Sequence, residues 1–264
     1  MKNKTYYLSC FNVVSNAVII LFLFQAILPA QSPIKESKNY KVYRIVGEKA
    51  QNYIVLLPYS YDSAEAYPVL VTLHGNGGNA ESMAGVFDVY AKLPLIIVIP
   101  QGQYPRTDIG FSWYLETNDK SMWEKTDRKS ADYIIDVIKD VQKSYKTDDI
   151  FLLGFSQGAS LAYMTGFKYP SVFRGIASIG GGLPAIDVEG SVVKTEDIKN
   201  ADGLKIFVSR GKDDSLVPKR AFDYQIDFLK KNDYKVESYE YDGPHDFTVD
   251  LLQELNKWLR KYSR

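Results

Sequence analysis

The fold is decided by one stretch of the chain, Asp149-Ile150-Phe151-Leu152-Leu153-Gly154-Phe155-Ser156-Gln157-Gly158. Its first six residues form a short apolar run ending in glycine, which is typical of a buried strand. Residues 157–168 follow as a helix that Pro170 ends. The glycines on both sides of Ser156 permit a tight turn that projects the serine hydroxyl above the sheet. We interpret Ser156 as a nucleophile; the alternative is a helix-start serine between two packing glycines.

Short apolar segments alternate with helical ones on both sides of this turn. We predict strands at 40–46, 51–57, 68–75, 95–100, 149–154, 173–179, 204–209 and 235–241. Helices are predicted at 79–91, 130–145, 157–168, 219–232 and 246–260. The link with Gly47 favours a hairpin between the first two strands. This alternation indicates an α/β protein with a mostly parallel central sheet of about eight strands, flanked by helices. The stretches 101–129 and 180–203 are long for plain connections, which is common in functional loops.

Composition excludes several classes of protein. The 264 residues are 45% hydrophobic and 24% charged, which is typical of a globular protein and excludes a multi-pass membrane protein or a disordered chain. Basic and acidic residues number 32 each, so the basic excess of a duplex nucleic-acid binder is absent. With only two histidines in the chain, a three-histidine zinc site is excluded, and we expect no metal.

The amino-terminal segment has the features of a secretory signal peptide. Lys2 and Lys4 precede a short apolar core, and Leu28-Pro29-Ala30 ends it. We predict cleavage after Ala30, a single domain over 31–264, and a secreted or periplasmic location without a stable membrane span. An uncleaved anchor is the alternative. Cleavage would also remove the only cysteine, Cys10, leaving neither a disulfide nor a thiol nucleophile.

A serine hydroxyl needs a base, and histidine is the usual base near neutral pH. His245 lies between the last strand and the last helix, where a loop can reach over the sheet to Ser156. We assign the base to His245, whose alternative is a surface loop histidine. His74 precedes Gly75-Asn76-Gly77-Gly78, and we interpret it as a structural residue that hydrogen-bonds this glycine loop.

A third residue must hold the tautomer of the base. Asp213 and Asp214 lie in the turn after the strand at 204–209, and each alternatively suits an ordinary turn or a helix cap. The amide of Gln157 lies at a helix start, where backbone N–H groups lack intrahelical partners and can stabilise a developing oxyanion.

Three segments resemble the phospholipase/carboxylesterase group of α/β-hydrolases, which includes the acyl-protein thioesterases. They are His74-Gly75-Asn76-Gly77-Gly78, Gly154-Phe155-Ser156-Gln157-Gly158-Ala159, and Gly211-Lys212-Asp213-Asp214-Ser215-Leu216-Val217-Pro218 followed by His245. The resemblance spans residues 50–260 and implies the α/β-hydrolase fold. Its spacing selects Asp214 as the acid, and it places the oxyanion hole at the amides of Gln157 and Asn76. The chain departs from it in its predicted signal peptide and in Arg210, where a histidine is frequent.

The resemblance implies a serine hydrolase of carboxylic esters that works through an acyl-enzyme and needs no cofactor. The substrate would be a small-molecule or polysaccharide-linked ester, and Trp113 in the 101–129 stretch is a candidate for its pocket. The alternative for Trp113 is a packing residue. Two further readings stay open: a peptidase or thioesterase using the same triad, and a non-catalytic binding protein on a hydrolase scaffold.

Overall fold

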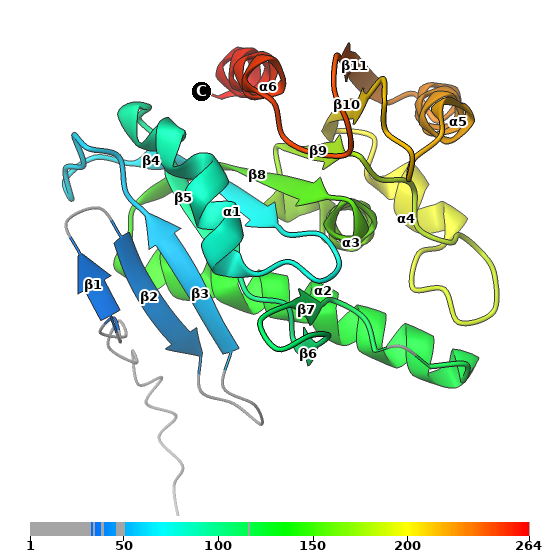
Figure 1. Ribbon diagram of the computed structural model, residues 1–264, viewed down its shortest axis with the longest axis horizontal. Coiled ribbons are helices and arrows are strands. Elements are labelled where there is room, and N and C mark those ends of the chain that lie inside the picture. The colour runs from blue at the N-terminus through cyan, green and yellow to red at the C-terminus, as the bar shows by residue number, and fades with distance from the viewer. Residues whose placement is uncertain (1–32, 34, 38–39, 46–50, 116, 264) are drawn as a thin grey trace, which may run out of the picture.

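The computed structural model describes residues 33, 35–37, 40–45, 51–115 and 117–263, and these build one nine-stranded sheet (Figure 1). The strands lie in the order β1-β2-β3-β5-β4-β8-β9-β10-β11. Their bounds are Lys35–Ser37 (β1), Tyr40–Ile45 (β2), Gln51–Leu56 (β3), Tyr67–Leu73 (β4), Ile96–Pro100 (β5), Thr147–Phe155 (β8), Gly175–Ile179 (β9), Lys205–Gly211 (β10) and Lys235–Tyr241 (β11). From β5 to β11 the neighbours are parallel, whereas β1, β2 and β3 join antiparallel. The expected signal peptide and the Gly47 link lie outside the described residues.

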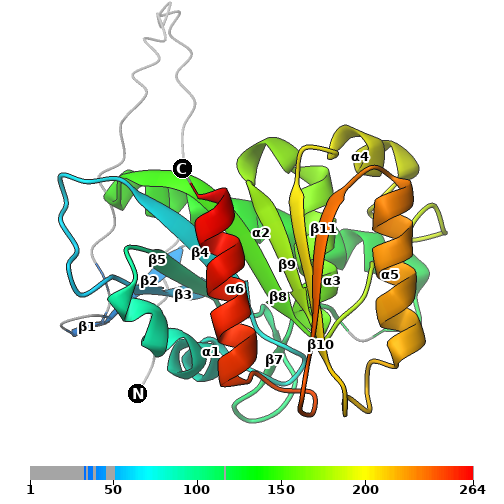
Figure 2. The same cartoon turned by 90° about the horizontal axis from the view of Figure 1, so that it is seen from above.

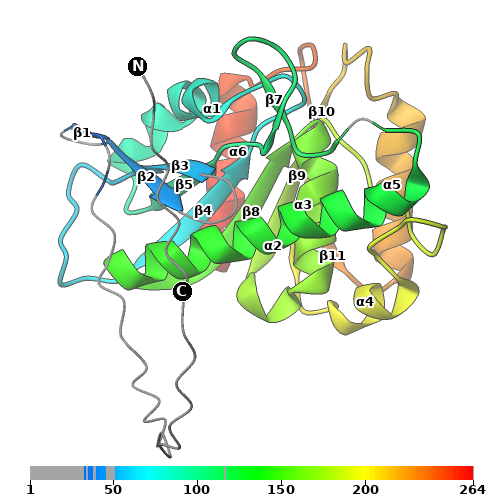
Figure 3. The ribbon, with the colours of Figure 1, turned by 90° about the horizontal axis from the view of Figure 1, so that it is seen from below.

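Helices cover both faces of the sheet. Their bounds are Ala80–Phe87 (α1), Lys120–Ser144 (α2), Gln157–Lys168 (α3), Thr195–Asn200 (α4), Lys219–Lys231 (α5) and Val249–Tyr262 (α6), with 3-10 turns at Asp88–Lys92 (η1) and Pro170–Val172 (η2). Figure 2 shows α1 and α6 on one face. Figure 3 shows α2 and α3 crossing the other.

Alternating side chains of the central strands supply one core on each side. In β8, Ile150 and Leu152 pack in the core beneath α2, α3 and α5, whereas Phe151 and Leu153 pack in the core beneath α1 and α6. All four are 5% exposed or less, because a central parallel strand has helices on both faces. This explains why the central strands read as unbroken apolar runs.

The parallel strands end at one edge of the sheet. The candidate site residues Ser156, Asp214 and His245 lie in the loops that follow strands at this edge. Leu73 at the end of β4 pairs in register with Gly154 of β8, and Phe155 pairs with Ile179 of β9. On the far side, Gly211 of β10 is in register with Tyr241 of β11. The loops that follow these strands are therefore brought side by side although they are far apart in the sequence.

The structure differs from the sequence prediction in several element bounds. The long helix α2 starts at Lys120, ten residues before the predicted 130–145. Its first turns carry no apolar stripe, since they are largely exposed; apolar periodicity begins only where the helix lies on the sheet. The stretch 180–203 contains α4, and α6 begins at Val249 rather than at 246.

The short elements were also missed. Strand β1 and a two-stranded ribbon of β6 (Tyr104–Pro105) and β7 (Phe111–Ser112) are too short to show a period of two. The sheet consequently has nine strands rather than about eight. In the part of the chain that the structure describes, no helix is long and apolar enough to cross a membrane.

Candidate active site

Ser156 occupies a strained turn between β8 and α3. Its backbone has φ 54° and ψ −116°, a conformation that a non-glycine residue rarely adopts. Such strain costs on the order of 1–3 kcal/mol and persists only where the surrounding structure imposes it. Here the Ser156 N–H donates to the carbonyl oxygen of Ile179 at 2.9 Å, which anchors the turn to β9.

The two glycines of the turn are required by close backbone approach. A Cβ on Gly154 would lie 2.0 Å from the carbonyl oxygen of Gly158, and one on Gly158 would lie 2.6 Å from that of Leu73. Both distances are far below van der Waals contact with backbone atoms that cannot turn aside. Glycine at both positions therefore permits the tight turn predicted from the sequence, and α3 begins directly against β4.

Asp214 and His245 are hydrogen-bonded to each other. The His245 Nδ1 lies 2.7 Å from the Asp214 Oδ2, although 31 residues separate the two in the chain. The Asp214 side chain is fully buried and the His245 side chain is 14% exposed. Asp213 is exposed. Of the neighbouring residues Asp213 and Asp214, it is Asp214 that has a recorded hydrogen bond to His245.

The environment of Asp214 favours its ionised form. Burial raises the pKa of this carboxyl, but hydrogen bonds from His245 and from the backbone amides of Val217 and Leu216 outweigh burial and hold the pKa below its ordinary value. The two amides donate to Oδ1 at 2.8 Å each, which leaves Oδ2 for the imidazole. A carboxylate held in this way orients the ring and can stabilise its protonated form.

Backbone contacts hold the acid loop against the histidine loop. The Asp213 N–H donates to the Gly243 carbonyl at 3.0 Å, and the Lys212 N–H donates to that of Tyr241 at 2.8 Å. The Tyr241 hydroxyl in turn donates to the Asp246 carbonyl at 2.6 Å. These bonds place the two loops in a single arrangement before any substrate binds.

His245 also lies against the serine turn. The ring of Phe155, the residue before Ser156, is 4.8 Å from the His245 ring between centroids. The His245 Nε2 is buried and has no hydrogen-bond partner among the described residues. Gly180 packs on the histidine: a Cβ there would lie 3.1 Å from His245 Nδ1, and its φ of +54° also favours glycine. Sequence reasoning missed the roles of Phe155 and Gly180; only the opening of Gly180-Gly181-Gly182 signalled this loop.

The glycine loop after β4 lies beside Ser156. A Cβ on Gly75, the residue before Asn76, would be 3.2 Å from the Ser156 Cβ. Within this loop the Gly77 N–H donates to Phe111 and the Gly78 N–H donates to Gly75. For the described residues, no hydrogen bond is recorded for the backbone N–H of Asn76 or of Gln157. The assignment of these two amides to the oxyanion hole stays a prediction.

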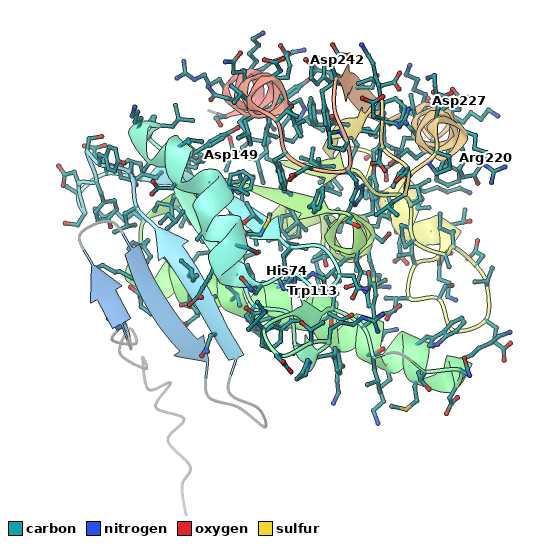
Figure 4. The ribbon with its side chains drawn as sticks, in the orientation of Figure 1. His74, Trp113, Asp149, Arg220, Asp227 and Asp242 are labelled. Carbon is teal, nitrogen blue, oxygen red and sulfur yellow. The ribbon has the colours of Figure 1, made fainter. Side chains whose placement is uncertain are left out.

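His74 and Trp113 lie side by side in the interior (Figure 4), with ring centroids 4.7 Å apart. Burial lowers the pKa of His74 to about 4, although its hydrogen bond to the Gly75 carbonyl raises it in part. The neutral ring therefore donates from Nδ1 to Gly75 at 2.8 Å and accepts at Nε2 from the Gly102 N–H at 2.9 Å. His74 supports the glycine loop, which agrees with its interpretation as a structural residue.

The candidate substrate residue Trp113 is a core residue instead. Its side chain is 0% exposed, and its Nε1–H donates to the His74 carbonyl at 2.7 Å. The indole therefore has no surface to offer a substrate, which corrects the expectation for this residue. An aromatic residue in a long loop can face inward or outward, and the local sequence holds no signal that distinguishes the two.

The side chain of Gln157 has a role that the sequence did not reveal. Its Oε1 accepts from the Trp113 N–H at 3.0 Å, and its Nε2 donates to the Ser112 hydroxyl at 3.0 Å. These bonds fasten the segment after β7 to the residue that follows Ser156. No group of three or more histidine, cysteine, aspartate or glutamate side chains suited to a metal occurs among the described residues.

A mostly parallel sheet with helices on both faces and a serine in a strained strand-to-helix turn is the α/β-hydrolase fold. The solved structure of esterase PE8 supports this, with a TM-score of 0.62 and 20% identity over 79% of this chain and 97% of that one. Residues 61–263 match the Phospholipase/Carboxylesterase family, and the chain belongs to that family of hydrolases.

Two curated relatives have similar sequences. The probable carboxylesterase SOBER1-like of Arabidopsis thaliana is 28% identical over 134 residues, which is 50% of this chain and 49% of the relative. Acyl-protein thioesterase 1 of Mycosarcoma maydis is 29% identical over 120 residues, 44% of this chain and 48% of the relative. The matched part thus spans about half the length of each of these relatives.

Proposed function

We propose that this protein hydrolyses carboxylic esters with Ser156 as nucleophile, His245 as general base and Asp214 as the acid that orients the base. The observation that carries the proposal is the 2.7 Å bond between Asp214 and His245 Nδ1, which leaves Nε2 without a partner among the described residues and so free to take the proton of Ser156. Membership of a family of carboxylesterases and thioesterases supports the same chemistry.

In this mechanism the Ser156 hydroxyl attacks the acyl carbonyl while the His245 Nε2 takes its proton. The backbone amides of Asn76 and Gln157 bind the oxyanion of the tetrahedral intermediate. Collapse expels the alcohol, which takes the proton from His245 and leaves an acyl group on the serine. Water then attacks this acyl-enzyme with His245 again as base, which releases the acid and restores the serine.

Ester, thioester and peptide bonds all suit this triad. Relatives named as a carboxylesterase and an acyl-protein thioesterase favour the first two. We place the ester first, and the thioester is the second candidate.

The test compares wild type, Ser156→Ala and Ser171→Ala on p-nitrophenyl esters of increasing acyl length, with reaction of a fluorophosphonate probe in parallel. Ser171 lies exposed in η2, beyond the far end of α3, and is the matched control. We expect labelling and hydrolysis in wild type and control, and neither in Ser156→Ala. Hydrolysis that survives in folded Ser156→Ala would remove the serine from the mechanism. Absence of both signals in wild type would favour a binding protein.

We also propose that residues 1–30 direct export and are removed. The support is the charged start, the short apolar core and the small residue Ala30 at its end. Intact-mass measurement of the protein recovered from outside the cytoplasm tests this, since cleavage after Ala30 would leave Gln31 as the first residue. A full-length mass would favour the uncleaved anchor.

A further inference from the structure

A second feature of the active-site edge is a cavity of about 560 Å³ at the start of α2. It is lined by Tyr114, Leu115, Thr117, Asn118, Trp123 and Asp127. None of these side chains takes part in the mechanism described above. Tyr114, Thr117, Asn118 and Asp127 have polar side chains that can form hydrogen bonds. Tyr114 and Trp123 are aromatic.

The cavity adjoins the nucleophile through a short chain of hydrogen bonds. The Tyr114 N–H donates to the Ser112 hydroxyl at 3.1 Å, and this hydroxyl also bonds the side-chain amide of Gln157 at 3.0 Å. Tyr114 is two positions after Ser112, and two residues of fully extended chain span at most about 7 Å. The wall of the cavity therefore begins within roughly that distance of Ser112, whose hydroxyl bonds the residue that follows Ser156.

One wall of the cavity is an aromatic surface held in place. The Trp123 Nε1–H donates to the Thr117 carbonyl at 2.8 Å, which ties the loop to α2. The residue is nevertheless 40% exposed, so the indole keeps a free face. Asp127 lies four residues further along α2, on the same side of the helix as Trp123. A ring stacked on Trp123 would thus have a carboxyl group beside it.

Two polar groups of the cavity lack good partners among the described residues. The Tyr114 hydroxyl is buried without any hydrogen bond. Asp127 makes only a long bond from the Thr126 hydroxyl, at 3.4 Å, and no ion pair is recorded for it. Tyr114 and Asp127 line the same cavity, and burial raises the pKa of the Asp127 carboxyl to about 6. Leaving a buried polar group unsatisfied is unfavourable, and a ligand that hydrogen-bonds both groups would remove that cost.

We propose that this cavity is a specificity subsite that binds a hydroxylated ring of the ester substrate. The ring lies on the Trp123 indole, and one ring hydroxyl donates to the Asp127 carboxylate while it accepts from the Tyr114 hydroxyl. This inference rests on the esterase function proposed above.

The lining favours a hydroxyl over a cation as the ligand group. A hydroxyl can donate and accept at once, so it satisfies both Asp127 and Tyr114, whereas an ammonium group only donates. Thr117 and Asn118 add neutral groups suited to further hydroxyls, and of the described lining residues Asp127 is the one with a carboxylate. The lining therefore selects a hydroxyl as the ligand group. The two arms of the experiment show whether this hydroxyl belongs to the acid or to the alcohol part of the ester.

The experiment measures kcat/KM for two matched pairs of esters. In the acid-side arm these are the methyl esters of para-hydroxyphenylpropanoic acid and of phenylpropanoic acid. In the alcohol-side arm they are monoacetylated methyl glucoside and cyclohexyl acetate. The variants are Asp127→Asn and Tyr114→Phe, which keep the shape of the side chain. Asp136→Asn is the matched control, since Asp136 is a 61% exposed aspartate on the same helix.

We expect the hydroxylated ester of at least one pair to be preferred about 10- to 100-fold by wild type and Asp136→Asn, as for one hydrogen bond to a charged group. That ratio should fall about tenfold or more in Asp127→Asn, and it should fall in Tyr114→Phe. Ratios near one in both arms, or ratios unchanged in both variants, would overturn the subsite. A higher kcat/KM for an ammonium-bearing ester of the same ring size would overturn it in favour of a cation site.

A binding measurement separates this proposal from the proposed function. Titration calorimetry follows the binding of para-hydroxyphenylpropanoate and of methyl glucoside, neither of which requires turnover. Weaker binding of either compound to Asp127→Asn than to Asp136→Asn supports the subsite even in a protein that hydrolyses no ester. Equal binding, or none to wild type at millimolar concentration, contradicts it even where p-nitrophenyl acetate is hydrolysed.

Discussion

Replacement of Asp214 by asparagine changes one atom at the centre of the site. The amide oxygen can still accept from the backbone of Leu216 and Val217, which now donate to Oδ1 at 2.8 Å. The NH2 group then faces His245 Nδ1, where the carboxylate lies at 2.7 Å. Because an NH2 group can only donate, Nδ1 must become the acceptor, and the imidazole proton moves to Nε2. A protonated Nε2 cannot take the proton of Ser156.

The size of the loss follows from two contributions. The charge-assisted bond is worth about 1.5–3 kcal/mol, and the wrong tautomer adds a comparable cost to reaching the transition state. Together they give about 3–6 kcal/mol, or roughly a 200- to 25,000-fold fall in kcat at 1.36 kcal/mol per tenfold. KM should change much less, since Asp214 is fully buried and touches no substrate.

The assay is p-nitrophenyl acetate hydrolysis by Asp214→Asn and by Asp213→Asn, with thermal melting of each protein to verify folding. The exposed neighbour Asp213 makes a close control, because the same chemical change is made one residue away. We expect Asp213→Asn to stay near the wild-type rate. A folded Asp214→Asn with more than a tenth of the wild-type kcat, or an equal loss in Asp213→Asn, would refute the argument from the tautomer.

Three further outcomes are expected. Trp113→Phe removes the indole bond to His74 and leaves a small void, so it should destabilise the protein by about 1–3 kcal/mol in urea melts; a changed KM with unchanged stability would restore Trp113 as a substrate residue. Gly158→Ala sets a Cβ 2.6 Å from the Leu73 carbonyl and should cost about 1–3 kcal/mol or more, visible as a fall in Tm of several degrees; a wild-type Tm would contradict this close approach. Because burial raises the pKa of Asp127 to about 6, its carboxyl favours the folded state at low pH and this contribution is lost as pH rises through 6. Asp127→Asn should therefore raise Tm relative to wild type at about pH 8 and lose this advantage near pH 4, and calorimetry that finds the same difference at both would exclude this titration.

Much of the site was predictable because its constraints are local. A serine between two glycines at a strand-to-helix junction needs no distant residue to define a sharp turn, and the structure has that turn at Ser156. Buried parallel strands must be apolar on both faces, so β4, β5 and β8 could be predicted from their unbroken apolar runs. Asp213 and Asp214 remained equivalent on local grounds, and only the family resemblance separated them before the geometry did.

The sequence by itself determined the alternation of strands and helices, and with it the edge of the sheet at which Ser156 and His245 both had to lie. It could not determine which loop side chains turn inward, because burial depends on contacts between segments distant in the chain. Tertiary structure alone decided that Trp113 packs on His74, that Gly180 packs against His245, and that the side chain of Gln157 holds the segment leading to the cavity. The physical reason is the distance along the chain over which each effect acts. Hydrophobic periodicity and turn sterics depend on residues a few positions apart, whereas the burial of a side chain depends on contacts that form only when the whole sheet has assembled.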